Sequence, residues 1–278
     1  MSKSKHRYEH GFVTFLDILG FREWVESGVS AEVVKERIDG LDKAFSMPAD
    51  VDEILGERQI AMSDSVVRVA KLRAGKGGGC ADLREVLLSL IHGQIEAIFD
   101  LKLLLRGAVT VGPVFIDKSN VFGPAFQMAV ALEKRVVGPF IAVDTELMDG
   151  VAMGLVTNPD ESPGRFRKDI RNLVTQLDGG VWVLDYLRNA ATEMDHPEFY
   201  PDLLMTHRDV CAKGMLAHHG APKVYEKYVM LAKYHNSVVD QLNADSSVPV
   251  SVLKINMPER ADGDETKNAA VAAGASHG

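Results

Sequence analysis

A buried-strand pattern that ends on an acid is the feature that most constrains this fold. Residues 11–17 (Gly-Phe-Val-Thr-Phe-Leu-Asp) read as a buried strand that ends on an acid, and Ile18-Leu19-Gly20-Phe21 leads into a stretch with helical character. A carboxylate at the end of a buried strand is costly unless it is paired or holds a metal ion. The sequence therefore predicts that Asp17 has a specific partner.

A second acid lies in a polar break between two further strand-like runs. Residues 59–70 predict a hairpin whose turn is Ser63-Asp64-Ser65. If these strands are neighbours of the first, Asp17 and Asp64 together indicate a divalent-metal site for phosphate chemistry. Taken alone, Asp17 is equally compatible with a strand-end cap or half of a salt bridge.

The order of the remaining elements predicts an α/β fold, a sandwich with a central mixed or antiparallel sheet flanked by helices. Helical spacing marks 31–45, with Ser30 as the N-cap, and also 82–101 and 125–135. Strands are expected at 103–116, as a pair broken at Gly112-Pro113, at 140–143, and at 173–187 around a glycine turn. Residues 75–79 predict a glycine-rich linker, and 158–168 predict turns.

The character of the chain changes near residue 190. Residues 201–218 and 222–242 predict two helices, 250–255 predict an edge strand, and the Ala/Gly/charge-rich residues 256–278 predict disorder. We therefore expect a first domain at 1–190 and a helical extension at 191–245, which extends that domain or supports dimerisation. A tail at 246–278 is expected to be disordered in large part.

The composition of this chain of 278 residues argues against several classes of binding partner. The net charge of −8 argues against general nucleic-acid binding. The two cysteines, Cys80 and Cys211, exclude a disulfide framework or a cysteine-based zinc site and fit a reducing cytosol. The polar N-terminus predicts no signal peptide, and no stretch reaches the ~18–20 apolar residues of a membrane span. We expect a cytoplasmic protein without membrane or nucleic-acid partners.

Four segments in this order resemble the catalytic domain of class III nucleotide cyclases. Residues 15–21 (Phe-Leu-Asp-Ile-Leu-Gly-Phe) resemble the first metal motif, and Ser63-Asp64-Ser65 resembles the second, with Ser63 where glycine is usual. Residues 105–114 are similar to the Arg-x-Gly-x-x-x-Gly-x-Val strand, and 121–133 to the Trp-Gly…Asn…Ala…Met-Glu helix. The resemblance covers about residues 11–145 and implies that family's fold.

The resemblance implies a role for each matching residue. Asp17 and Asp64 would bind two divalent ions, Mn²⁺ or Mg²⁺, with help from the backbone carbonyl of Ile18. Gly20 and Phe21 would offer backbone N–H groups to the triphosphate. One ion would lower the pKa of a ribose 3′-hydroxyl, and the other would steady the triphosphate, from which pyrophosphate departs.

The departures from the family pattern concern the base and the transition state. The lysine and aspartate with which adenylate cyclases read adenine are Ile60 and Asn120 here. The transition-state asparagine is Gln127, and the arginine one turn later is Ala131. This combination resembles the bacterial Pycsar pyrimidine cyclases of anti-phage defence. It implies a phosphorus–oxygen lyase that converts UTP to cyclic UMP, or CTP to cyclic CMP as the second choice.

Several of these residues also suit purely structural roles. Asn120 also suits a turn, and Gln127 also suits a solvated helix face. Arg106, which the resemblance places on phosphate, also suits a pair with a surface acid.

Two other functions compete with a pyrimidine cyclase: a purine cyclase with unusual base contacts, and a catalytically inactive nucleotide-binding sensor. The two acids count against the sensor, and Ala131 counts for it.

One copy of each motif implies a homodimer with two equivalent sites at the subunit interface. The metal acids and Arg106 would come from one subunit, and the residues that read the base would come from the other. The resemblance also implies a downstream effector protein that the cyclic nucleotide controls.

Overall fold

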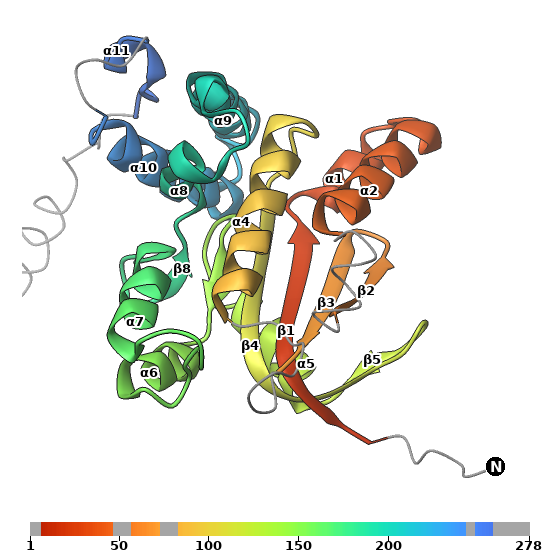
Figure 1. Cartoon of the computed structure of the whole chain (residues 1–278). Coiled ribbons are helices and arrows are strands. Elements are labelled where there is room, and N and C mark those ends of the chain that lie inside the picture. Colours follow the sequence, from red (N-terminus) through yellow and green to blue (C-terminus); the bar gives the residue numbers. More distant parts are fainter. Residues whose placement is uncertain (1–6, 47–56, 73–82, 243–247, 258–278) are drawn as a thin grey trace, which may run out of the picture.

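A computed structural model describes residues 7–46, 57–72, 83–242 and 248–257. Within these ranges the centre is an eight-stranded sheet with the order β2-β3-β1-β4-β6-β8-β7, and β5 pairs with the far end of β4 (Figure 1). All neighbouring strands are antiparallel except β4 and β6. The strands are β1 (Glu9–Ile18), β2 (Glu57–Met62), β3 (Ser65–Lys71), β4 (Leu105–Ile116), β5 (Val121–Phe122), β6 (Ile141–Val143), β7 (Val174–Gln176) and β8 (Trp182–Leu184).

Helices cover both faces of this sheet, so the predicted fold class of a mixed sheet flanked by helices is confirmed. In Figure 1, α4 crosses one face, and the C-terminal helices continue the layer on that side. The helices are α1 (Phe21–Glu26), α2 (Ala31–Phe45), α4 (Leu83–Phe99), α5 (Pro124–Glu133), α6 (Thr145–Met153), α7 (Pro163–Asn172), α8 (Tyr186–Glu193), α9 (Tyr200–Ala217), α10 (Pro222–Val239) and α11 (Val250–Leu253), with a 3₁₀ turn η1 (Pro197–Phe199).

Two apolar clusters, one on each face, follow from the period of two along the strands. On β1, Leu16 and Ile18 belong to the large cluster that includes α4, α9 and α10. Val13 points the other way, into a smaller cluster with Ala125 and Ala129 of α5. Asp17 shares the parity of Val13 and therefore faces the α5 side of the sheet. This placement leaves its carboxylate away from the main core.

Most predicted elements are found close to their expected bounds. The Ser30 hydroxyl accepts from the Val33 N–H at 3.4 Å and begins α2, as predicted. The predicted 59–70 hairpin is β2–β3, and β3 pairs with β1 from Gly11↔Lys71 to Asp17↔Ser65. The expectation that the two acidic motifs lie on neighbouring strands is therefore confirmed. The linker at 75–79, Cys80 and the tail beyond residue 257 lie outside the described residues.

One predicted break in the sheet is wrong. Residues 105–116 form a single strand instead of a pair interrupted at Gly112-Pro113. His10 of β1 lies opposite Pro113, whereas β6 pairs only with Gly107, Ala108 and Val109. The missing N–H of Pro113 therefore falls where β4 has no β6 neighbour, which is the position in which a strand tolerates proline.

Two predictions in the second half of the chain are also wrong. Residues 163–172 form α7 where turns were expected: Ser162 caps it, and Phe166 and Ile170 bury one helical face. The predicted edge strand at 250–255 is the short helix α11 with an extended end. It is held by side chains instead of a sheet neighbour, because His235 Nε2 bonds the Leu253 carbonyl at 2.8 Å.

The C-terminal helices continue the same core. Tyr186 of α8 and Leu231 of α10 belong to the cluster that holds Leu87 of α4. The expected domain boundary at residue 190 falls inside α8. The helical extension is thus packed onto the sheet domain through a shared apolar core.

Candidate active site

Asp17 lies at the end of β1, between partners on both neighbouring strands. Its register opposite Ser65 of β3 and Arg106 of β4 brings three predicted segments together. Asp17 Oδ2 accepts from Nε and Nη2 of Arg106 at 2.9 and 2.6 Å, and Oδ1 accepts from the Ser65 hydroxyl at 3.2 Å. The structure therefore joins the first metal motif to the arginine of the 105–114 strand.

Asp64 occupies the turn between β2 and β3, beside Asp17. Its backbone carbonyl accepts from the Ile18 N–H at 3.1 Å, and Ser63 takes the left-handed conformation, with φ of 56°, that the tight turn requires. Burial raises the pKa of Asp17 from its ordinary value; Arg106 opposes this shift and the charge of Asp64 adds to it. The two predicted acids are therefore close enough to repel each other.

Glu133 completes the site, although no role was predicted for it from the sequence. Its Oε1 lies 2.8 Å from Arg106 Nε, and its side chain is only 3% exposed. Burial raises the pKa of Glu133, while the Arg106 charge lowers it. Arg106 thus bridges two carboxylates, from β1 and from the end of α5. A glutamate that ends an apolar helical run was the available signal.

Gly20 turns the chain from β1 into α1. Its φ is 76°, a left-handed conformation that costs a residue with a side chain about 1–2 kcal/mol. The Leu19 N–H bonds the Leu104 carbonyl at 2.8 Å, which fixes the loop at its start. Phe21 begins α1, where the first backbone N–H groups have no partner within the helix.

The residues predicted to read the base lie elsewhere. Asn120 is in the turn between β4 and β5, where its Nδ2 donates to Asp117 Oδ1 at 3.2 Å. Ile116 is ten residue steps along β4 from Arg106, which is about 33 Å at about 3.3 Å per residue. Asn120 therefore does not share a site with Arg106 of the same subunit.

The other two residues of this group lie on the α5 side of the sheet. Ile60 is half-buried on β2 and packs against the cluster that includes Val13 and Ala129. Gln127 is exposed on α5. Arg58, which the sequence did not single out, donates from Nη1 to the Ile116 carbonyl at 2.7 Å and ties β2 to the β4–β5 hairpin. The binding roles of Ile60, Asn120 and Gln127 stay predictions.

The donor set at Asp17 fits hard divalent ions. Among the described residues, no group of three or more histidine, cysteine, aspartate or glutamate side chains is placed to hold a metal ion by itself. Two carboxylates and the Ile18 carbonyl match the incomplete oxygen set that Mg²⁺ and similar ions complete with water and substrate phosphates. Because Asp17 Oδ2 is held by Arg106, ion binding there requires this pair to loosen.

Among the described helices, none is long and apolar enough to cross a bilayer. No protein-family model matches the sequence. The search of curated proteins gives no match either.

Three solved structures match this chain at low structural similarity. The adenylyl cyclase CyaB from P. aeruginosa gives a TM-score of 0.41 at 13% identity, over 64% of this chain and 94% of that one. The catalytic core of a rhodopsin-guanylyl cyclase with converted specificity, solved with ATPαS, gives 0.40 at 15%, over 64% and 96%. A class III adenylyl cyclase-like ATP-binding protein from Pseudomonas aeruginosa gives 0.36 at 11%, over 84% and 60%. All three TM-scores lie below 0.5, so the function is inferred from the residues of the site and not from these matches.

Proposed function

We propose that this protein is a class III-type nucleotide cyclase that converts UTP to cyclic UMP and pyrophosphate. The observation that carries the proposal is the convergence of Asp17, Asp64 and Arg106, three residues from separate segments, at one end of the central strands. Two carboxylates beside a guanidinium suit a substrate that brings both metal ions and phosphate charge.

Each residue has a defined task in this reaction. Two bound divalent ions would supply the charge that acidifies the ribose 3′-hydroxyl and steadies the triphosphate. Asp17 and Asp64 would supply carboxylate oxygen ligands to these ions. Arg106 neutralises phosphate charge once its guanidinium leaves Asp17. The backbone N–H groups at Gly20 and Phe21 bind phosphate oxygens at the start of α1. The new bond joins the 3′-oxygen to the α-phosphorus as the bond to pyrophosphate breaks.

The choice of a pyrimidine rests on Ile60 and Asn120. Neither provides the charged groups with which adenylate cyclases read adenine. An asparagine amide both donates and accepts, so it can meet the edge of uracil, which presents an N–H between two carbonyls. The same amide, turned over, meets cytosine, so cyclic CMP is the alternative product.

Homodimerisation follows from the separation of the two groups of residues. Because Asn120 lies beyond Ile116, which is about 33 Å from Arg106 along β4, a base reader for this site has to come from a partner subunit. The β4–β5 hairpin carries an exposed aromatic cluster: Phe122 stacks on Phe115 at 4.7 Å and meets Tyr8 edge-on at 6.1 Å. Tyr8 is 54% and Phe122 48% exposed, which is typical of an interface anchor.

A catalytically inactive nucleotide sensor is the second candidate. It is favoured by Ala131, which is exposed on α5 where cyclases carry the transition-state arginine. The resemblance to Pycsar cyclases further suggests that the product acts as a messenger in anti-phage defence, through an effector that it opens or activates.

The test is incubation of purified protein with each of the four nucleoside triphosphates and Mn²⁺, followed by mass identification of cyclic products. We expect cyclic UMP as the main product, and Asn120→Ala should lower its yield without creating cyclic AMP. Faster conversion of ATP than of UTP or CTP would reject the pyrimidine assignment. Nucleotide binding without any product would favour the sensor.

A further inference from the structure

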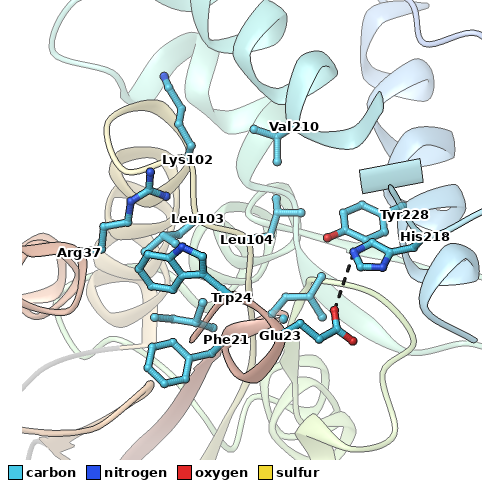
Figure 2. Close-up of a pocket in the computed structure, with 13 residues that line it drawn as sticks. Phe21, Glu23, Trp24, Arg37, Lys102, Leu103, Leu104, Val210, His218 and Tyr228 are labelled. Atoms are coloured by element: carbon cyan, nitrogen blue, oxygen red, sulfur yellow. Dashed lines mark ion pairs between the residues drawn. The ribbon is translucent and has the colours of Figure 1, made fainter. Parts of the chain in front are cut away.

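A second pocket, of about 340 Å³, lies on the other side of the loop that follows Asp17. Ile18, whose side chain points to the sheet face opposite to that of Asp17, lines it. Its walls come from α1, α2, the turn before β4, and the helices α9 and α10 (Figure 2). Asp17, Asp64 and Arg106 do not line this pocket, whereas Ile18, Gly20 and Phe21 do, so the pocket adjoins the proposed catalytic site and shares the loop 18–21 with it.

Two cations line one side of the pocket without a carboxylate partner. Within the described residues, no acidic oxygen lies within 4.0 Å of Arg37 or Lys102, whereas Lys35, on the same helix as Arg37, pairs with Asp39. The Arg37 guanidinium lies 5.3 Å from the centre of the Trp24 ring. In a chain of net charge −8, two cations without an acidic partner among the described residues, one of them over an indole ring, can form a site for an anion.

The backbone of Lys102 is strained at this position. Its φ is 58°, in the left-handed region that is unfavourable for a residue with a side chain. Strain of this kind clusters at binding sites. The ammonium donates to the Phe99 carbonyl and lies 5.4 Å from the centre of the Phe99 ring, so contact with a ligand in the pocket requires this side chain to turn.

The opposite wall is aromatic. Figure 2 shows Tyr228 and His218 across the pocket from Arg37 and Lys102. The two rings are stacked with centroids 5.5 Å apart, and His218 Nε2 lies 3.9 Å from Glu23 Oε2. Tyr228 is held in place because its ring lies against Gly214, where a Cβ atom would approach to 2.0 Å. The pocket is thus cationic at one side and aromatic, with an acid, at the other.

We propose that this pocket binds a small molecule with one aromatic ring and one anionic group, of the nucleoside monophosphate class. The phosphate lies at Arg37 and Lys102, and the base lies between Trp24 and Tyr228. The pocket volume is within the range of small-molecule sites.

Binding there also bears on the proposed catalytic site, and this part rests on the proposed function. The Leu19 N–H bonds the Leu104 carbonyl of the pocket wall at 2.8 Å, while the adjacent Ile18 N–H bonds the Asp64 carbonyl at 3.1 Å. A ligand that holds this loop is therefore linked to Asp17 and Asp64 through these two backbone hydrogen bonds. Its binding changes the turnover rate without direct contact with either aspartate.

The test uses Trp24 as its own reporter. The chain has two tryptophans, so Trp182→Phe leaves Trp24 as the only one. Titration with uridine monophosphate in a metal chelator should give saturable quenching of its fluorescence. Arg37→Gln and Lys102→Asn should each weaken binding about tenfold, because each removes a charge-assisted contact. Asparagine tolerates the left-handed backbone of position 102. Lys168→Gln, at an exposed site on α7, is the matched control.

Three further outcomes decide the proposal. Equilibrium dialysis on the unaltered protein should give the same affinity, and uridine or inorganic phosphate alone should bind at least about tenfold more weakly. Absence of saturable binding at millimolar nucleotide overturns the pocket. Binding that is lost in Asp17→Asn but kept in Arg37→Gln places the nucleotide in the catalytic site and overturns it too. None of these measurements depends on turnover, so failure here is distinct from failure of the cyclase proposal.

Discussion

The Glu133–Arg106 pair predicts how readily the site accepts metal ions. Arg106 Nε lies 2.8 Å from Glu133 Oε1, while its Nη2 lies 2.6 Å from Asp17 Oδ2. When Asp17 takes up an ion, Arg106 has to give up the aspartate, and Glu133 remains to hold it. Glu133→Gln keeps the shape and a neutral acceptor but removes the charge. Arg106 should then stay on Asp17 and compete with the ion.

The size of the effect follows from the contact. At an effective dielectric constant of about 20, charges 2.8 Å apart attract by roughly 6 kcal/mol, and burial of Glu133 offsets most of this. Removal of the Glu133 charge from this ion pair should therefore weaken its hold on Arg106 by about 1–1.5 kcal/mol. The Mn²⁺ dissociation constant should therefore rise about five- to tenfold. Because burial raises the pKa of Glu133, a neutral side chain is tolerated there, and unfolding free energy should change by less than about 1 kcal/mol.

The assay is titration of free Mn²⁺ by its electron paramagnetic resonance signal, with the metal dependence of cyclic UMP formation as a second readout. Glu226→Gln, at an exposed glutamate of α10, is the control and should leave both unchanged. An unaltered Mn²⁺ affinity in a folded Glu133→Gln protein would refute the idea that Glu133 releases Asp17 from Arg106.

Three other predictions concern the site, the assembly and pH. Asp17→Asn or Asp64→Asn should abolish cyclic product, a loss of several kcal/mol of transition-state stabilisation, while size-exclusion chromatography still shows the wild-type oligomer. Co-expressed Asp17→Asn and Asn120→Ala subunits should regain one good site per heterodimer; heterodimers that form without any rescue would contradict a shared site. Burial lowers the pKa of His207 well below its ordinary 6.5, so the unfolded chain takes up the proton first as pH falls. Unfolding free energy, measured by urea midpoints, should therefore fall by up to about 1.4 kcal/mol per pH unit below about pH 6.5, until the folded pKa is reached. His207→Gln should flatten this slope, and the exposed His219→Gln should not.

Local patterns were enough to predict the strands and helices that carry the site. Asp17 ends an apolar strand and Asp64 lies in a polar turn, so both acids could be placed from alternation and turn chemistry. The pairing of β1 with β3 and β4 makes them neighbours of Arg106. No role was predicted for Glu133, because its contact with Arg106 forms only when α5 packs back over β4. This is a long-range contact that no local pattern contains.

The errors have the same origin. Pro113 reads locally as a break, yet it is tolerated in β4 because no β6 neighbour needs its N–H. Residues 250–255 have β-branched, strand-like character, but Asn236 Nδ2 donates to the Ile255 carbonyl at 2.9 Å and its Oδ1 accepts from the Ile255 N–H at 2.9 Å. A side chain thus supplies the hydrogen bonds that a sheet edge would have supplied. Tertiary partners decide both cases.

The loop 18–20 lies between the proposed catalytic site and the pocket that the C-terminal helices line. On one side its backbone bonds the Asp64 turn, and on the other it bonds Leu104 at the wall of the second pocket. The same pocket is lined by Tyr228 of the C-terminal helices, which pack onto the sheet domain through a shared core. The helical extension therefore both packs on α4 and lines the pocket beside the loop 18–20. Through a single loop it reaches the residues that would hold the triphosphate, and a ligand between the loop and the extension would act on both.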